Sequence, residues 1–179
     1  MEILTATEND AEAIAALVNS GYRGEYSRQG WTSEVDLLGG SRIDAHELRL
    51  VMQREATVVL KGVEEGKIIA CVELATHYKK LYLGMLTVEP TLQAKGVGKQ
   101  MLAAADKIAR AQGCKSIYMT VISDRAELIA WYGRNGFMPT GEERPFTNTN
   151  PVFGLPKKPL RFVVLEKVLS GFDSQVAGF

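Results

Sequence analysis

The stretch Val88-Glu89-Pro90-Thr91-Leu92-Gln93-Ala94-Lys95-Gly96-Val97-Gly98-Lys99-Gln100-Met101-Leu102 reads as a strand end, a loop and a helix start in direct succession. Gly96 and Gly98 can adopt φ > 0 and allow a ligand to approach the backbone closely. The first N–H groups of a helix that begins near Gly98 have no acceptor within the helix, and they favour anions. Lys95 and Lys99 add positive charge beside them. The stretch therefore predicts a loop that binds a diphosphate.

The sequence fits two other known phosphate-binding motifs poorly. A dinucleotide fingerprint needs a third glycine three residues after Gly98, where Met101 stands. A P-loop needs Ser or Thr after its lysine, but Gln100 follows Lys99. A helix that is simply entered through a tight turn is the remaining alternative.

The flanking pattern favours a ligand. The order Val-x-Pro-x-x-Gln-x-x-Gly-x-Gly-x-x-Met-Leu over residues 88–102 resembles the acyl-CoA pyrophosphate loop of the GNAT superfamily of N-acetyltransferases, whose signature is Gln/Arg-x-x-Gly-x-Gly/Ala. The resemblance implies acetyl-CoA as co-substrate, and a strand before the loop that bulges and splays from its neighbour. The cofactor-binding residues that it implies are Leu86, Thr87, Val88, Gln93, Ala94, Lys95, Gly96, Val97, Gly98 and Lys99.

A second segment, residues 130–137, is similar to the Leu-Tyr-x-x-x-Gly-Phe pattern of the same family. The match places Tyr132 near the coenzyme sulfur, where its hydroxyl would donate to the departing thiolate. The alternative for Tyr132 is a tyrosine that packs in the core. The family often has Asn and Ala where this chain has Arg125 and Leu128. Arg125 is kept as a cofactor-binding candidate, and its alternatives are a helix cap or an ion pair with a carboxylate.

The sequence also suggests a catalytic base and an acceptor wall, by which we mean the side chains that line the binding site of the acceptor amine. Glu73 lies in an apolar strand, where a carboxylate is unusual, and it is either the catalytic base or an exposed strand residue. The acceptor wall is predicted in residues 22–40, which are irregular but aromatic, with Tyr22, Tyr26 and Trp31 as substrate-binding residues. The acidic residues of this segment, Glu25, Glu34 and Asp36, favour a cationic amine, unless the segment is simply a solvated loop.

The order of apolar patterns predicts an α/β chain with a central mixed sheet and helices on both faces. The family resemblance makes this sheet mostly antiparallel and splayed. Strands are expected at 3–6, 57–61, 67–76, 81–88, 116–121 and 160–167, and helices at 10–22, 44–55, 98–112 and 125–135. Five of the six prolines fall in residues 139–159, which therefore read as a long loop.

Composition limits the partners. The chain has 179 residues, of which 46% are hydrophobic, and this fits one domain over 1–169 with a tail at 170–179. Its 21 basic and 21 acidic residues cancel, so neither nucleic acid nor a membrane is expected as a partner. Cys71 and Cys114 have no metal-type spacing, and two histidines are too few for a zinc site, so no metal is expected. Reduced thiols favour the cytoplasm. The tail could dock on a second copy, which would make a homodimer.

These features together predict an acyltransferase. The expected reaction moves the acetyl group of acetyl-CoA to a primary amine of a small molecule by direct attack in a ternary complex. Two alternatives stay open, namely a peptide or protein N-acetyltransferase and a non-catalytic acyl-CoA-binding sensor. The acceptor itself is not indicated by the resemblance.

Overall fold

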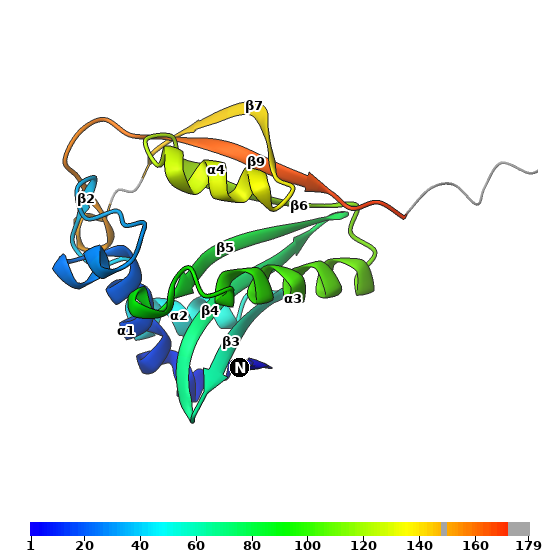
Figure 1. The fold of residues 1–179 in the computed structure, drawn as a ribbon, viewed down its shortest axis with the longest axis horizontal. Helices are drawn as coiled ribbons and strands as arrows, with labels where there is room; N and C mark the ends of the chain where they lie inside the picture. The colour runs from blue at the N-terminus through cyan, green and yellow to red at the C-terminus, as the bar shows by residue number, and fades with distance from the viewer. Residues whose placement is uncertain (148–149, 172–179) are drawn as a thin grey trace, which may run out of the picture.

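The computed structural model, drawn as a ribbon in Figure 1, describes residues 1–147 and 150–171. A seven-stranded sheet has the order β1-β3-β4-β5-β6-β9-β7 and is antiparallel throughout except for the parallel pair β5–β6. The prediction of a mixed, mostly antiparallel sheet is therefore confirmed. The strands are β1 (Glu2–Thr5), β3 (Thr57–Glu64), β4 (Lys67–His77), β5 (Lys80–Val88), β6 (Ser116–Ile122), β7 (Met138–Pro145) and β9 (Arg161–Val168).

Helices cover both faces of the sheet, as the sequence predicted. Helices α1 (Ala11–Tyr22) and α2 (Ala45–Met52) pack on one face through apolar side chains that include Ile14 and Leu48. Helices α3 (Val97–Ala111) and α4 (Ala126–Arg134) pack on the opposite face with Met101 and Tyr132. Because both faces are covered, the central strand β4 is apolar along most of its length instead of alternating.

The start of α2 illustrates how the sequence sets these elements. Asp44 has extended backbone angles, and its side chain accepts a hydrogen bond from the Glu47 N–H at 2.8 Å. This is a standard N-cap, which satisfies one of the N–H groups that have no acceptor within the helix.

The expectation of a long loop over residues 139–159 is wrong in part. Residues Met138–Pro145 form β7, which pairs with β9. Strand β7 is at the edge of the sheet, where a proline does not remove a hydrogen bond from an inner strand pair. The pairing also shifts register between Pro139 and Glu143, where Gly141 has φ 88°. The prolines therefore mark an edge strand with a bulge and not a break in the sheet.

A small second sheet joins two segments that are far apart in the sequence. Strand β2 (Leu38–Gly39) pairs with β8 (Leu155–Pro156), so the aromatic segment 22–40 lies beside the segment that follows β7. The remaining turns are the 3₁₀ helices η1 (Glu8–Asp10), η2 (Glu25–Gln29), η3 (Pro90–Leu92) and η4 (Pro151–Phe153).

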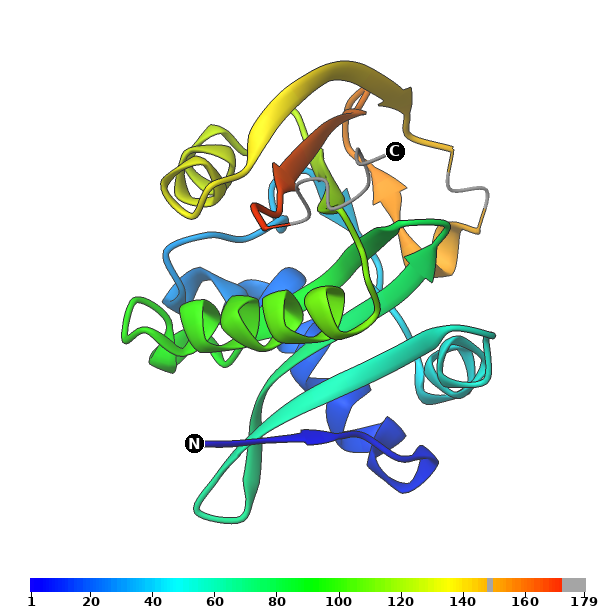
Figure 2. The same cartoon turned by 90° about the vertical axis from the view of Figure 1, so that its right-hand side faces the viewer.

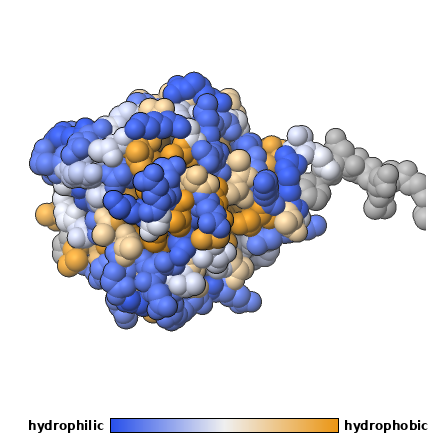
Figure 3. Space-filling model, turned by 60° about the horizontal axis from the view of Figure 1, so that its bottom comes forward, coloured by the Kyte–Doolittle hydropathy of each residue, from blue (hydrophilic) through white to orange (hydrophobic). Residues whose placement is uncertain are grey.

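Figure 2 shows α3 crossing in front of β4 and β5. On the face drawn in Figure 3, apolar side chains gather near the centre and hydrophilic ones surround them. Within residues 1–147 and 150–171, no helix is long and apolar enough to cross a membrane. Most of the predicted tail, from residue 172 on, lies outside the described residues.

Candidate active site

The sheet opens between β5 and β6. These strands pair only from Lys80 opposite Ser116 to Tyr82 opposite Tyr118. Beyond these three pairs the strands diverge, as Figure 1 shows. The C-terminal half of β5 therefore has no pairing with β6 on this side. We call this opening the β5–β6 gap.

A bulge in β5 increases the opening. Pairing with β4 shifts register between Cys71 and Glu73, and Met85, in the bulge, has φ 54°. Within the bulge, the Leu86 carbonyl accepts a hydrogen bond from the Tyr22 hydroxyl at 3.0 Å. Burial raises the pKa of the Tyr22 hydroxyl to about 12, so it stays a donor at neutral pH. The N-terminal helix α1 thus holds the bulged end of β5 in place.

The start of α3 faces the same opening. Gly96 precedes the helix in the left-handed conformation at φ 85°, and Ala94 has φ 62°. No side chain caps this helix start among the described residues. Its first N–H groups are therefore available to a ligand. A Cβ on Gly98 would lie 3.3 Å from two ring atoms of Trp131, so only glycine fits without moving that ring.

A cavity of about 350 Å³ lies between β5, the start of α3 and α4. We call it the amide cavity. It brings together most of the predicted cofactor and substrate residues: Tyr22, Trp31, Leu86, Thr87, Val88, Gln93, Ala94, Gly96, Gly98, Lys99, Arg125 and Tyr132. Lys95 and Val97 do not line it; Lys95 is exposed, and Val97 is buried in the core beneath α3.

The Gln93 side chain makes two hydrogen bonds within the protein that the sequence did not suggest. Its side-chain amide donates to the Val88 carbonyl at 3.2 Å, and its side-chain oxygen accepts from the backbone N–H of Trp31 at 3.1 Å. The Trp31 ring lies 6.2 Å from that of Trp131. Trp31 therefore forms part of the amide cavity wall, on the side of the α3 loop, and its position fits a donor-side contact better than the acceptor wall.

Tyr132 lies where the amide cavity continues into the β5–β6 gap. Its ring packs edge-on against Trp131 at 5.0 Å and Phe137 at 5.6 Å, which fixes its orientation. Its hydroxyl makes no hydrogen bond to any residue in the described part of the chain. Burial raises the pKa of this hydroxyl well above its ordinary value of 10.0. The phenol therefore remains protonated and free to donate at neutral pH.

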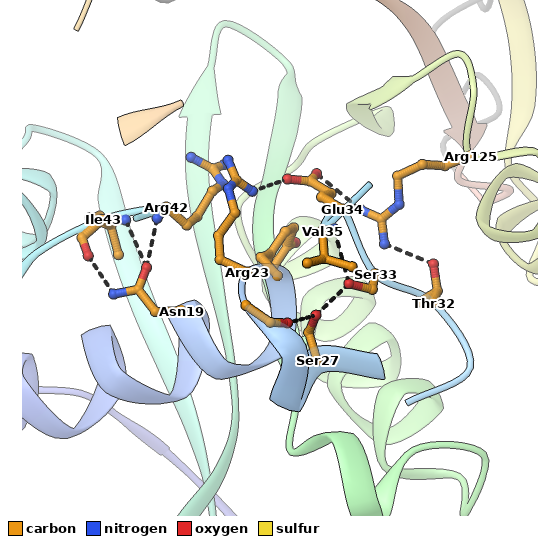
Figure 4. A network of polar contacts seen from close by, with 12 residues as sticks. Asn19, Arg23, Ser27, Thr32, Ser33, Glu34, Val35, Arg42, Ile43 and Arg125 are labelled. Atoms are coloured by element: carbon orange, nitrogen blue, oxygen red, sulfur yellow. Dashed lines mark hydrogen bonds and ion pairs between the residues drawn. The ribbon is translucent and has the colours of Figure 1, made fainter. Parts of the chain in front are cut away.

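A buried ion network forms the wall of the gap (Figure 4). Glu34 pairs with Arg23 through one carboxylate oxygen and with Arg125 through the other at 3.0 Å. Arg125 also donates to the Thr32 hydroxyl at 2.8 Å. The three charged side chains are 6–8% exposed. Arg125 therefore lines the cavity, but its guanidinium is held by the protein, as one of the sequence alternatives proposed.

Two further cavities continue from the first. A connecting cavity of about 190 Å³ in the β5–β6 gap shares Tyr22, Arg125 and Tyr132 with the amide cavity. A pocket of about 380 Å³ then shares Glu34 and Arg42 with the connecting cavity. We call it the arginine pocket. The three hollows thus form a series of adjoining spaces that runs through the opening in the sheet.

Two predicted site residues lie apart from these spaces. Tyr26 is 44% exposed, donates to Glu89 at 2.5 Å and lines none of the three cavities. Glu73 likewise lines none of them, and its carboxylate lies 3.8 Å from the Arg54 guanidinium. Burial raises the pKa of Glu73, but the residue is not placed to touch a ligand there.

The acidic side chains of residues 22–40 form ion pairs with arginines of the same chain. Glu25 and Asp36 both pair with Arg28, and Glu34 pairs with Arg23 and Arg125. This arrangement does not support the expectation that they would attract a cationic amine. Among residues that the sequence did not suggest, Arg134 lines the amide cavity and makes no ion pair with any described residue.

A splayed mixed sheet with an uncapped helix start at its opening is the arrangement that the sequence resemblance implied. A model of the Acetyltransferase (GNAT) family matches residues 10–137, and the chain belongs to this family. The predicted family is therefore confirmed. A search among curated proteins found no match.

Solved structures show the same fold. The ribosomal-protein-S18-alanine N-acetyltransferase from Escherichia coli is 15% identical with a TM-score of 0.73, and 99% of each chain is covered. A putative phosphinothricin N-acetyltransferase is 18% identical with a TM-score of 0.70 over 95% of this chain and 99% of that one. A putative streptothricin acetyltransferase from Bacillus anthracis, in complex with acetyl coenzyme A, is 15% identical with a TM-score of 0.57, covering 67% of this chain and 66% of that one.

The family uses acetyl-CoA, and acetyl-CoA is the co-substrate of this chain. The residues present fit it. The α3 start offers free N–H groups, and Lys99 and Arg134 add two cations without ion-pair partners in the described chain, which suits phosphate groups. The exposed edge of β5 offers backbone groups to an amide-containing arm.

Proposed function

We propose that this chain transfers the acetyl group of acetyl-CoA to a primary amine of a small molecule by direct attack in a ternary complex. The observation that carries the proposal is the series of adjoining cavities through the β5–β6 gap. The amide cavity and the arginine pocket lie at its two ends. Two ligands that enter from these ends can therefore meet at the gap without an intermediate on the enzyme.

The residues that hold the donor follow from the amide cavity. The N–H groups at the start of α3 bind the diphosphate, with Lys99 and Arg134 beside it. The backbone of Leu86 to Val88 orients the arm that carries the thioester. When bound, acetyl-CoA supplies an acyl group that is already activated. The protein therefore has to align the amine and stabilise developing charge.

We assign Tyr132 as the general acid. Its free hydroxyl at the junction of two cavities and its raised pKa support this role. A phenol that stays protonated can donate to a thiolate, whose conjugate acid has a pKa of about 8.5. The position of Glu73 does not favour direct contact with the acceptor, so we propose that water removes the proton from the ammonium group and that Glu73 acts at most through water.

A pocket bounded by two segments of the chain supports a small acceptor. Pairing of β2 with β8, together with the bond from Lys157 N–H to the Leu37 carbonyl at 2.9 Å, brings residues 22–40 against the segment after β7. These two segments contribute Leu38 and Phe153 to the arginine pocket. A peptide acceptor would need an open groove. The protein N-acetyltransferases among the similar structures nevertheless make a peptide N-terminus the second candidate.

Release of free thiol from acetyl-CoA tests the proposal directly. The intact protein is assayed with amino acids, polyamines, aminoglycosides and peptides as separate acceptors. We expect thiol release with at least one small amine and little with peptides. Preference for a peptide would support the second candidate. Tight acetyl-CoA binding with no thiol release on any amine would instead indicate a sensor without catalysis.

We further propose that the protein acts in the cytoplasm as one domain over residues 1–169. The thiols of Cys71 and Cys114 are free and buried, which agrees with a reducing compartment. Fractionation of cells with an antibody to the protein tests the location. Sedimentation of the full chain tests the homodimer that was expected from the tail.

A further inference from the structure

The arginine pocket carries more positive charge than the buried network neutralises. Arg23 and Arg42 line this pocket, and Arg125 lines the connecting cavity beside it. The single carboxylate of Glu34 is shared by Arg23 and Arg125. The Arg42 guanidinium has no ion pair or hydrogen bond with any described residue and lies 5.5 Å from the centre of the Tyr22 ring. One guanidinium is thus left for a ligand.

Arg23 is a second, independent indication that positive charge in this pocket is not fully neutralised by the protein. The residue is 7% exposed, and its Nε makes no hydrogen bond to any described residue although it is buried. Burial lowers the pKa of the Arg23 guanidinium; Glu34 opposes this effect, while the charge of Arg42 adds to it. Figure 4 shows both guanidinium groups close to the Glu34 carboxylate. An anion placed between Arg42 and Arg23 would relieve their repulsion and meet the free donors.

One other carboxylate lines the arginine pocket. Glu47, from the first turn of α2, has no ion pair among the described residues and lines neither the connecting cavity nor the amide cavity. Arg42 lines both the pocket and the connecting cavity. The free cation is therefore adjacent to the gap, where the amine must react, and the free carboxylate is not.

Apart from the hydroxyl of Thr147, the rest of the pocket is apolar. Phe146, Phe153 and Phe162 line it from three segments, and the rings of Phe146 and Phe162 lie 5.4 Å apart. Aromatic side chains offer a large apolar surface against which an apolar side chain can be buried. The pocket thus combines a free guanidinium near the gap with an apolar space beyond it.

We propose that the acceptor is an amine that also carries a carboxylate and an apolar side chain, as an α-amino acid does. Its carboxylate binds Arg42, its side chain lies among the phenylalanines, and its amine points into the β5–β6 gap. This inference rests on the proposed acetyl transfer and specifies its substrate class. It replaces the cationic acceptor that the acidic residues of segment 22–40 had suggested.

Matched acceptors test the charge. Phenylalanine is compared with phenylalaninamide, and leucine with leucinamide, because each pair differs only in the carboxylate. We expect kcat/KM to be about 10- to 100-fold higher for the acids, the range of a charge-assisted hydrogen bond. The amides have less basic amines, which biases the comparison against this result. With each rate corrected for the fraction of free amine, equal rates for acids and amides would overturn the proposal, and faster reaction of diamines would assign recognition to Glu47.

Variants then test the residue. Arg42→Met keeps the aliphatic stem, and Arg49→Met is the matched control, since Arg49 pairs with Glu12 and lines none of the three cavities. Calorimetry with phenylalanine alone should show about 10- to 100-fold weaker binding in Arg42→Met and no change in Arg49→Met. Acetyl-CoA affinity should be unchanged in both, which also shows that the variants fold. Wild-type phenylalanine affinity in a folded Arg42→Met variant would overturn the role of Arg42.

The outcomes separate this inference from the proposed function. Thiol release with uncharged amines but no preference for acids would leave acetyl transfer standing and remove the substrate class. Phenylalanine binding that depends on Arg42, without thiol release, would keep the carboxylate site and remove the reaction.

Discussion

The amide cavity and the arginine pocket adjoin the same gap in the sheet, yet they are built differently. The amide cavity uses the backbone of β5 and of the α3 start, and six of its lining residues fall in the motif at 88–102. The arginine pocket uses long side chains from α2 and the turn before it, from segment 22–40, from β6 and β9, and from the segment after β7. A backbone-lined cavity suits a constant ligand, while a pocket of side chains can change its ligand through single substitutions.

The ion network that separates the two sites gives the largest expected effect. Glu34→Gln keeps the shape of the side chain but leaves Arg23 and Arg125 without their shared counter-charge. We expect the free energy of unfolding to fall by about 3–5 kcal/mol, as for other buried pairs that lose one partner. Chemical denaturation measures this loss.

Glu25→Gln is the control, because Glu25 is in the same segment and its exposed pair with Arg28 should contribute little to stability. A Glu34→Gln variant as stable as Glu25→Gln would mean that the wall does not depend on this network.

Tyr132→Phe examines the junction of the amide cavity with the gap. The substitution keeps the ring packing and removes only the hydroxyl, so kcat should fall about 10²-fold with acetyl-CoA affinity unchanged. Tyr118→Phe is the control, because Tyr118 lines none of the three cavities. Wild-type kcat in Tyr132→Phe, with chemistry shown to be rate-limiting, would leave Tyr132 as a packing residue.

The pH profile gives a related expectation. Burial raises the pKa of Tyr132, so its acid form persists to a higher pH than that of an exposed tyrosine. We expect the wild-type rate to rise as the amine loses its proton and then to stay level up to about pH 10. A fall of kcat near pH 8 in stable protein would contradict an acid role for this residue.

Gly98→Val should affect the amide cavity alone. The added side chain meets the Trp131 ring, and overpacking of this kind costs about 1–3 kcal/mol. Acetyl-CoA should bind about 10- to 100-fold more weakly in calorimetry, while phenylalanine affinity stays the same. Gly133→Val is the control, since a Cβ at Gly133 meets no atom within 4 Å. Loss of both affinities would show that the two sites are not independent.

Trp31→Ala should have the smallest effect and decides on which side Trp31 acts. Its ring lies against Trp131, and an aromatic pair contributes about 0.5–1.5 kcal/mol. The KM for acetyl-CoA should therefore rise about 3- to 10-fold, and the KM for the acceptor less. Tyr26→Ala, in the same segment but outside the cavities, should change neither value. A larger rise in the acceptor KM would restore Trp31 to the acceptor wall that the sequence suggested.

The loop and helix start that line part of the amide cavity could be predicted from the sequence, because their conformation depends on residues close together in the chain. Gly96, Gly98 and Gln93 lie within six residues, and the conformations that they permit can be read from the chain itself. The sequence did not predict that Arg23, Arg125 and Glu34 would meet, because such a contact depends on how distant segments fold together. The prolines of β7 led to the wrong prediction of a loop, because a proline disrupts an inner strand but is tolerated in an edge strand. Whether a strand lies at the edge also depends on how distant segments fold together.

During synthesis, the residues that line the amide cavity and those that line the arginine pocket are completed at different times. Every residue that lines the amide cavity is synthesised by Asn135, whereas the arginine pocket requires Phe162. The β2–β8 pairing likewise has to wait for Pro156. A nascent chain emerging from the ribosome therefore carries all the lining of the amide cavity, and also Arg42, before it has the phenylalanines that complete the arginine pocket.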